Sequence, residues 1–201
     1  ELNRTGDGAS DAVVSWRPGI GWDNRLAPTD PRHALLDLYL PIASATPARP
    51  VTVGHLGQSL DGFIATHEGE SQFVTGEENI LHLHRMRALC DAVIVGAGTV
   101  AADDPQLTTR KVTGPHPVRV VLDPARRLDP DFKVFTDERT DRLYVTTDGQ
   151  VQAGETHVGR APIITIPKAE KGVDCAAVLR ALRERGCYRV FVEGGGVTVS
   201  M

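Results

Sequence analysis

Residues Asp91–Arg110, DAVIVGAGTVAADDPQLTTR, contain the pattern that decides the fold class. The apolar, β-branched run at Ala92–Val95 is typical of a strand buried on both faces of a parallel sheet. Gly96 and Gly98 follow at once, so the chain must turn sharply, and Thr99–Ala102 is expected to open a short helix. A glycine turn that leads into a helix N-terminus favours an anion such as a phosphate.

The second half of this stretch carries carboxylates, hydroxyls and an arginine. Asp103 and Asp104 stand before Pro105, which ends a helix, and Leu107–Arg110 places two threonines before a guanidinium. Adjacent residues that leave a helix point in different directions, so only one of the two carboxylates is expected to face a site. Similar turns also occur in α/β proteins that bind no nucleotide, and Asp-Asp-Pro can simply cap a helix. The stretch alone leaves both interpretations open.

Composition limits the class of protein. The chain has 201 residues, of which 41% are hydrophobic, enough for one domain with a real core. Only 5% are aromatic and the formal net charge is −4, which argues against a nucleic-acid partner. No apolar run reaches the ~18 residues of a membrane helix. Cys90, Cys175 and Cys187 form no metal-ligand pattern, so we expect three buried or half-buried thiols and no metal; their odd number without a secretory signal favours a cytoplasmic location.

The chain is expected to have two parts, an N-terminal arm and linker over residues 1–50 and the main domain over residues 51–201. Turn-forming residues dominate 11–21 and 24–31, and HALLDLYL at 33–40 predicts a short helix that stops at Pro41. Residues 1–50 contain no cysteine.

The main domain alternates strands and helices, which predicts a mainly parallel α/β sheet with ligands at the carboxyl ends of its strands. Thr75 and Glu78 form a capping box for a helix on which His82 and His84 are expected at the surface. The expected strands are 51–56, 92–95, 118–123, 142–146, 161–166 and 188–192, and a second amphipathic helix is expected over 174–185.

A second glycine turn, Glu193–Gly196, follows the last strand, and a helix is expected to begin at Val197. Because a helix that begins five residues from Met201 cannot cover a sheet, we expect that a C-terminal portion of the domain is missing from this sequence.

Eight short motifs over Val51–Ser200 occur in a known order: Ser59–Gly62, Glu70–Phe73, Arg87-Ala88, Gly98–Val100, Asp103–Pro105, Leu107–Arg110, Val120–Asp123 and Val192–Gly195. With these motifs the chain resembles the reductase domain of the bifunctional riboflavin-biosynthesis deaminase/reductase family. The resemblance implies a dihydrofolate-reductase-like fold, a mixed, mainly parallel sheet with helices on both faces. It also implies a cytoplasmic homodimer that uses NADPH to reduce a 5-phosphoribosylamino-pyrimidine to the ribitylamino form. The deaminase partner in that family needs a zinc site of the Pro-Cys-x-x-Cys type, which residues 1–50 cannot supply because they contain no cysteine.

The resemblance assigns site residues by matching positions. The substrate is expected to contact Ser71, Arg87, Leu107, Arg110 and Glu193, with the arginines near its phosphate. The cofactor is expected to contact Gly57, Phe73, Thr99, Asp103, Gly194, Gly195 and Gly196, and the first glycine turn adds Gly96 and Gly98.

Two positions depart from the family pattern. His55 stands where the family commonly has lysine, and Phe73 stands where it commonly has tryptophan. His55 can still donate a proton, and with Asp103 it is a candidate catalytic residue. Arg126 and Arg127, beyond the strand at 118–123, can bind the 2′-phosphate of NADPH or can be a solvated pair.

Three alternatives to the function that the resemblance implies remain. Gly96–Ala101 fits G-x-G-x-x-A, as in a Rossmann dehydrogenase, but no such motif follows the first strand of the domain. The chain can also be a nucleotide-binding protein without catalysis, or a reductase of the same fold that acts on another pyrimidine or a pterin.

Overall fold

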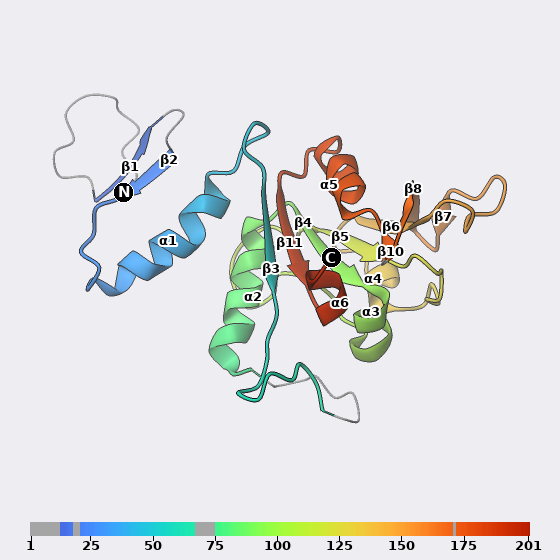
Figure 1. Ribbon diagram of the computed structural model, residues 1–201, viewed down its shortest axis with the longest axis horizontal. Coiled ribbons are helices and arrows are strands. Elements are labelled where there is room, and N and C mark those ends of the chain that lie inside the picture. Colours follow the sequence, from blue (N-terminus) through green and yellow to red (C-terminus); the bar gives the residue numbers. More distant parts are fainter. Residues whose placement is uncertain (1–12, 18–20, 67–74, 171) are drawn as a thin grey trace. The chain divides into compact units, whose positions relative to one another are not determined.

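The computed structural model describes residues 13–17, 21–66, 75–170 and 172–201, and it divides into the units Glu1–Val51 and Thr52–Met201 (Figure 1). The strands of the larger unit are β3 (Val51–His55), β4 (Ala92–Gly96), β5 (Val118–Leu122), β6 (Arg142–Thr147), β7 (His157–Val158), β8 (Ala161–Ile166), β9 (Lys168–Ala169), β10 (Gly172–Val173) and β11 (Arg189–Glu193). Its helices are α2 (Glu77–Leu89), α3 (Ala97–Asp103), α4 (Lys133–Thr136), α5 (Cys175–Arg183) and α6 (Gly196–Val199).

Seven of these strands form one sheet in the order β3-β11-β4-β5-β6-β8-β7. The pairs β11–β4, β4–β5, β5–β6 and β6–β8 are parallel, whereas β7 is antiparallel to β8. The sheet is therefore mixed and mainly parallel, as the sequence predicts, and β9 and β10 make a separate antiparallel pair.

Strand β4 lies in the middle of the sheet and is buried along its whole length. Ala92 and Ile94 pack in one apolar cluster with Val178 and Leu182 of α5. Val93 and Val95 point to the opposite face, because side chains alternate along a strand. On that face α2 packs against β11, so helices cover both faces of the sheet, as predicted.

Two expectations about α2 are wrong. The helix begins at Glu77, after an N-cap at Gly76 that makes no side-chain bond, so Thr75 and Glu78 form no capping box. The reason is that the Thr75 hydroxyl instead accepts a hydrogen bond from Asn79 Nδ2 at 2.8 Å. His84 is only 3% exposed rather than at the surface, because the loop that contains Arg110 packs against it. His82 is half-buried.

The smaller unit contains a hairpin of β1 (Val14–Arg17) and β2 (Gly21–Asn24), followed by α1 (Pro31–Ala43). Turn-rich composition hid the hairpin, whose strands have only four residues each. Pro41 lies inside α1 and does not stop it, because a proline near a helix end removes only one backbone hydrogen bond. Asn24 Nδ2 donates to the His33 carbonyl and to Asp37, which ties α1 to β2.

The three cysteines are unpaired thiols; Cys90 and Cys187 are buried and Cys175 is half-buried, as predicted. Within the described ranges, no helix combines the length and the apolarity that crossing a membrane requires. The same ranges hold no cluster of three or more side chains that could bind a metal ion.

Candidate active site

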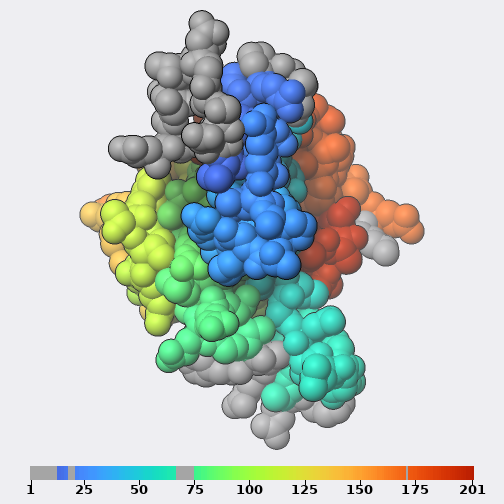
Figure 2. All heavy atoms as spheres, turned by 90° about the vertical axis from the view of Figure 1, so that its left-hand side faces the viewer, coloured from blue at the N-terminus to red at the C-terminus, as the bar shows by residue number. Residues whose placement is uncertain are grey.

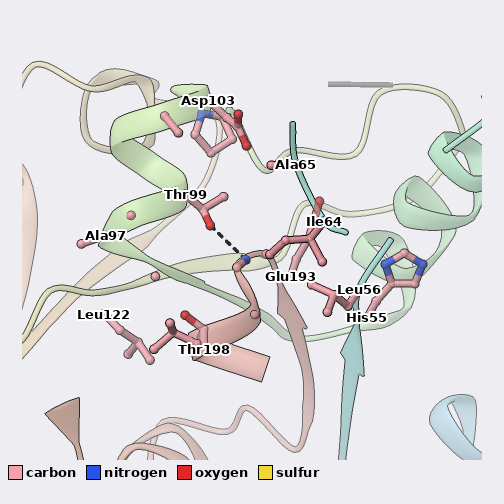
Figure 3. Close-up of a pocket in the computed structure, with 18 of the residues that line it drawn as sticks. His55, Leu56, Ile64, Ala65, Ala97, Thr99, Asp103, Leu122, Glu193 and Thr198 are labelled. Carbon is pink, nitrogen blue, oxygen red and sulfur yellow. Dashed lines mark hydrogen bonds between the residues drawn. The ribbon is translucent and has the colours of Figure 1, made fainter. Parts of the chain in front are cut away.

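A cleft of about 600 Å³ opens at the carboxyl ends of β3, β4, β5 and β11 (Figure 3). Its walls come from residues 55–57 and 64–65, from α2 and α3, and from the segment between β11 and the end of α6. This volume falls in the range of small-molecule sites, and open α/β sheets place their ligands at this edge. The cleft lies at the edge of the sheet where the sequence predicts ligands.

The two glycine turns meet in this cleft. The backbone N–H of Gly195 donates to Thr99 Oγ1 at 3.0 Å, which joins the turn after β11 to α3 (Figure 3). A Cβ atom on Gly96 would lie 2.3 Å from Thr198 Oγ1, and one on Gly194 would lie 3.0 Å from Thr99 Cγ2. Gly194 also has a φ of +110°, so both positions need glycine.

These turns are candidates to hold the phosphates of a dinucleotide. Bare backbone leaves N–H groups accessible to a pyrophosphate, and Gly98 and Gly57 line the same cleft. A Cβ atom on Gly57 would meet the Thr75 side chain at 2.7 Å, whereas one on Gly98 would enter open space.

Asp103 and Asp104 point in different directions, as the sequence predicts. Asp103 is the last residue of α3 and lines the cleft (Figure 3). Asp104 has a φ of +41° and faces Lys133, whose backbone N–H donates to it at 2.8 Å and whose Nζ lies 3.0 Å from its carboxylate. Asp104 therefore anchors the start of α4, and Asp103 is the carboxylate of the two that lines the cleft.

His55, at the end of β3, also lines the cleft (Figure 3). Its Nε2 lies 2.9 Å from Asn79 Oδ1, and Asn79 donates onward to Thr75. The His55 ring is 5.5 Å from the ring of His82, and burial followed by the charge of His55 lowers the pKa of His82. No sequence pattern singles out Asn79, because its partner Thr75 lies before the first residue of α2.

Arg87 and Glu193 form a buried ion pair between α2 and β11. Arg87 Nε donates to Glu193 Oε2 at 2.8 Å, a second bond joins Nη2 to Oε1, and Nη1 donates to the Thr108 carbonyl at 3.2 Å. Arg87 is 7% exposed, and Glu193 lines the cleft. The structure thus joins two predicted substrate residues to each other, with Arg87 orienting Glu193.

The segment Leu107–Arg110 runs from the cleft to the surface. Leu107 is buried, lines the cleft and has a φ of +53°, a conformation uncommon for a non-glycine residue. Arg110 is exposed, and its Nη1 donates to Thr108 Oγ1 at 2.7 Å. Within this segment Leu107 lines the cleft and Arg110 does not.

The two arginines after β5 have different surroundings. Arg126 is paired with Glu155 through both terminal nitrogens and also donates to the Gln150 carbonyl at 3.0 Å. Arg127 lines the cleft. Of the two residues considered for the 2′-phosphate, Arg127 is therefore the one that faces the site. Ser71 and Phe73 lie outside the described residues.

Comparisons with known proteins give the family. A family model described as the RibD C-terminal domain matches residues 51–201. A 2,5-diamino-6-ribosylamino-4(3H)-pyrimidinone 5′-phosphate reductase of Methanothermobacter thermautotrophicus is 36% identical over 150 residues, which cover 73% of this chain and 68% of that protein. The riboflavin biosynthesis protein RibD of Aquifex aeolicus is 32% identical over 156 residues, covering 77% of this chain and 43% of that protein.

A solved structure supports the same assignment. The diaminohydroxyphosphoribosylaminopyrimidine deaminase/5-amino-6-(5-phosphoribosylamino)uracil reductase of Thermotoga maritima superposes with a TM-score of 0.65 at 32% identity, covering 83% of this chain and 44% of that one. The chain spans less than half the length of the Aquifex aeolicus and Thermotoga maritima proteins.

Fold, cleft and relatives together define an oxidoreductase of dihydrofolate-reductase-like fold from riboflavin biosynthesis, a class that uses a nicotinamide cofactor. The chain belongs to the RibD C-terminal domain family. This fold excludes the Rossmann dehydrogenase alternative.

Proposed function

We propose that the chain reduces a 5-phosphoribosylamino-pyrimidine to its ribitylamino form with NADPH. The observation that carries this proposal is the cleft, in which both glycine turns, Asp103, His55 and Glu193 line one cavity. The name of the archaeal relative, a ribosylamino-pyrimidinone 5′-phosphate reductase, supports the same substrate class.

The reaction opens the ribose ring and adds one hydride at the anomeric carbon and one proton. A bound nicotinamide cofactor supplies the hydride. The chain must bind both molecules in a reactive orientation, exclude water and deliver the proton. We assign cofactor contacts to Gly57, Phe73, Gly96, Gly98, Thr99, Asp103, Gly194, Gly195 and Gly196, with Arg127 in place of Arg126 at the 2′-phosphate.

Substrate binding is assigned to Ser71, Leu107, Arg110 and the Arg87–Glu193 pair. Arg110 is the anchor for the substrate phosphate, because an exposed guanidinium can form two parallel hydrogen bonds to a phosphate. Arg87 is already bound to Glu193, so it holds that carboxylate toward the cleft. Asp103 and His55 are the candidates that deliver the proton, since both line the cleft.

The deciding experiment follows NADPH oxidation with the phosphorylated ribosylamino-pyrimidine, in its amino and oxo ring forms, and identifies the ribityl product. We expect one product per NADPH consumed. Binding of both ligands without oxidation would instead make the chain a nucleotide-binding protein. Turnover only with a pterin or another pyrimidine would keep the reductase class and reject the substrate.

The assembly and location are further proposals. We propose a homodimer, on the resemblance to the family, and sedimentation or light scattering of the purified chain tests it. We propose a cytoplasmic location because the three cysteines are unpaired thiols, which suits a reducing compartment.

A further inference from the structure

Two histidines hold the backbone of the segment that carries Arg110. The backbone N–H of Arg110 donates to His84 Nδ1 at 3.0 Å, and the N–H of Thr109 donates to His116 Nδ1 at 3.1 Å. His84 is on α2 and His116 is in the loop before β5, so consecutive amides are bound from two separate elements. Figure 2 shows the yellow-green residues of this part of the chain beside the green α2.

The protonation state of both rings follows from these contacts. A backbone N–H can only donate, so each Nδ1 must be the unprotonated, accepting nitrogen of a neutral imidazole. Burial, followed by the charges of Arg87, Arg110 and Lys111, lowers the pKa of His84 to about 4, while a hydrogen bond with the Thr108 backbone opposes this shift. His84 therefore remains a neutral acceptor near neutral pH.

The rest of the segment is also bound on both sides. Thr108 is fully buried and its carbonyl accepts from Arg87, while Thr109 Oγ1 donates to the Pro115 carbonyl at 2.9 Å. Arg110, in contrast, is exposed, and its Nη1 donates to Thr108 Oγ1 at 2.7 Å. The direction of the guanidinium thus depends on where the backbone of the segment is held.

We propose that His84 and His116 are positioning residues that fix the backbone at Thr109 and Arg110, so that the Arg110 guanidinium is oriented to receive the substrate phosphate. This inference rests on the proposed function, in which Arg110 binds that phosphate.

A neutral acceptor suits this place for an electrostatic reason. A carboxylate at position 84 could also accept the Arg110 N–H, but it would attract the nearby guanidinium and compete with the phosphate. An imidazole Nδ1 accepts the same hydrogen bond without adding negative charge. The segment is held while the charge of Arg110 remains available.

The test compares His84→Leu and His116→Leu, which remove the acceptor, with His84→Asn and His116→Asn, which keep an acceptor oxygen near the position of Nδ1. His157→Leu, at an exposed histidine on β7, is the matched control. Two sets of measurements are made for each variant. The first is the hydrogen-exchange rates of the Thr109 and Arg110 amides without ligand, and the second is the KM and kcat for the phosphorylated substrate and its dephosphorylated analogue.

We expect each Leu variant to speed exchange of its own amide about tenfold and to raise KM for the phosphorylated substrate about tenfold, the scale of one lost buried hydrogen bond. The kcat, and the KM for the dephosphorylated analogue, should stay within about twofold, and the Asn variants should recover most of the loss. His157→Leu should change none of these quantities.

Faster exchange of the Thr109 or Arg110 amide with no change in KM for the phosphorylated substrate would overturn the positioning role. An equal rise in KM for the phosphorylated substrate and for its dephosphorylated analogue would overturn it as well. If His84→Leu does not fold, the half-buried His116 and the two Asn variants still decide the question. Failure of the proposed function can be told apart from failure of the positioning role. If the proposed function is wrong, the unsubstituted chain does not oxidise NADPH, whereas the amide exchange that tests the positioning role is measured without turnover.

Discussion

At the end of α3, two adjacent carboxylates have different tasks. Asp103 lines the cleft and Asp104 holds Lys133 at the start of α4. We predict that Asp103→Asn lowers kcat about 10²-fold with NADPH affinity nearly unchanged, because amides do not transfer protons. Asp104→Asn is the matched control and should keep kcat within about twofold while lowering stability by up to ~1 kcal/mol, since its ion pair is partly exposed. Measuring kcat, cofactor affinity and Tm for both variants checks this, and a rate loss confined to Asp104→Asn would reverse the assignment.

Arg110 is predicted to recognise the substrate phosphate. Arg110→Ala should cost about 2 kcal/mol in kcat/KM for the phosphorylated substrate, the scale of a lost charge-assisted hydrogen bond. Steady-state kinetics with the dephosphorylated analogue is the control, because that analogue lacks the group that Arg110 binds. An equal loss with both substrates would mean that Arg110 does not bind the phosphate.

Arg126 and Arg127 provide another matched pair. Arg127 faces the cleft, whereas Arg126 is paired with Glu155. Arg127→Ala should weaken NADPH binding about tenfold and leave NADH binding unchanged, since only NADPH carries the 2′-phosphate. Arg126→Ala should alter neither affinity by more than about twofold. Fluorescence titration with both cofactors measures the effect; a chain that binds NADH as tightly as NADPH would rule out this role.

At the scale of elements, α2 connects the sheet to the Arg110 segment through two side chains of opposite character. Arg87 joins it to Glu193 of β11, and His84 joins it to the backbone of Arg110. The first contact is an ion pair, which depends on charge. The second requires that a side chain remain uncharged, so it makes the element sensitive to acid.

We therefore predict a loss of stability in mild acid. The pKa of His84 is about 4 in the folded chain, against 6.5 for an ordinary histidine, so the unfolded chain takes up this proton first as pH falls. The contribution of the neutral His84 ring to the free energy of unfolding is fully present above pH 6.5. It decreases as the pH falls below 6.5 and is lost as the pH passes through about 4. His82, whose pKa burial also lowers, acts in the same direction.

Thermal unfolding of the unsubstituted chain and His84→Asn between pH 7 and 4 tests this prediction. The Tm of the unsubstituted chain should fall more steeply than that of the variant, because the variant lacks the titrating ring. Burial raises the pKa of the Asp91 carboxyl, but hydrogen bonds from Arg189 and Tyr188 outweigh it and lower the pKa overall. Carboxylates of this kind reduce the stability of the chain only at lower pH, so they do not obscure the difference. Parallel curves would show that His84 does not titrate in this range.

At the scale of the whole molecule, the larger unit combines a buried sheet with a cleft at one edge. Strand β4 and the two glycine turns are predictable from sequence, because burial on both faces requires a continuous apolar run and a close backbone approach requires glycine. The divergence of Asp103 and Asp104 is predictable for the same local reason, since neighbouring residues leave a helix in different directions. These features depend on residues close together in the chain.

The pairings of polar side chains depend on residues that are far apart. Arg87 with Glu193, Arg126 with Glu155, and His84 with the Arg110 amide come from different elements, so no local pattern marks them. The same holds for the burial of His84, which follows from the loop packed on α2 rather than from the helical periodicity. The sequence alone therefore determined the sheet, its turns and the position of the cleft, since these follow from local burial and backbone freedom. Only the tertiary structure decided which charges are neutralised and which face the cleft, because a polar group takes its partner from whatever the fold brings next to it.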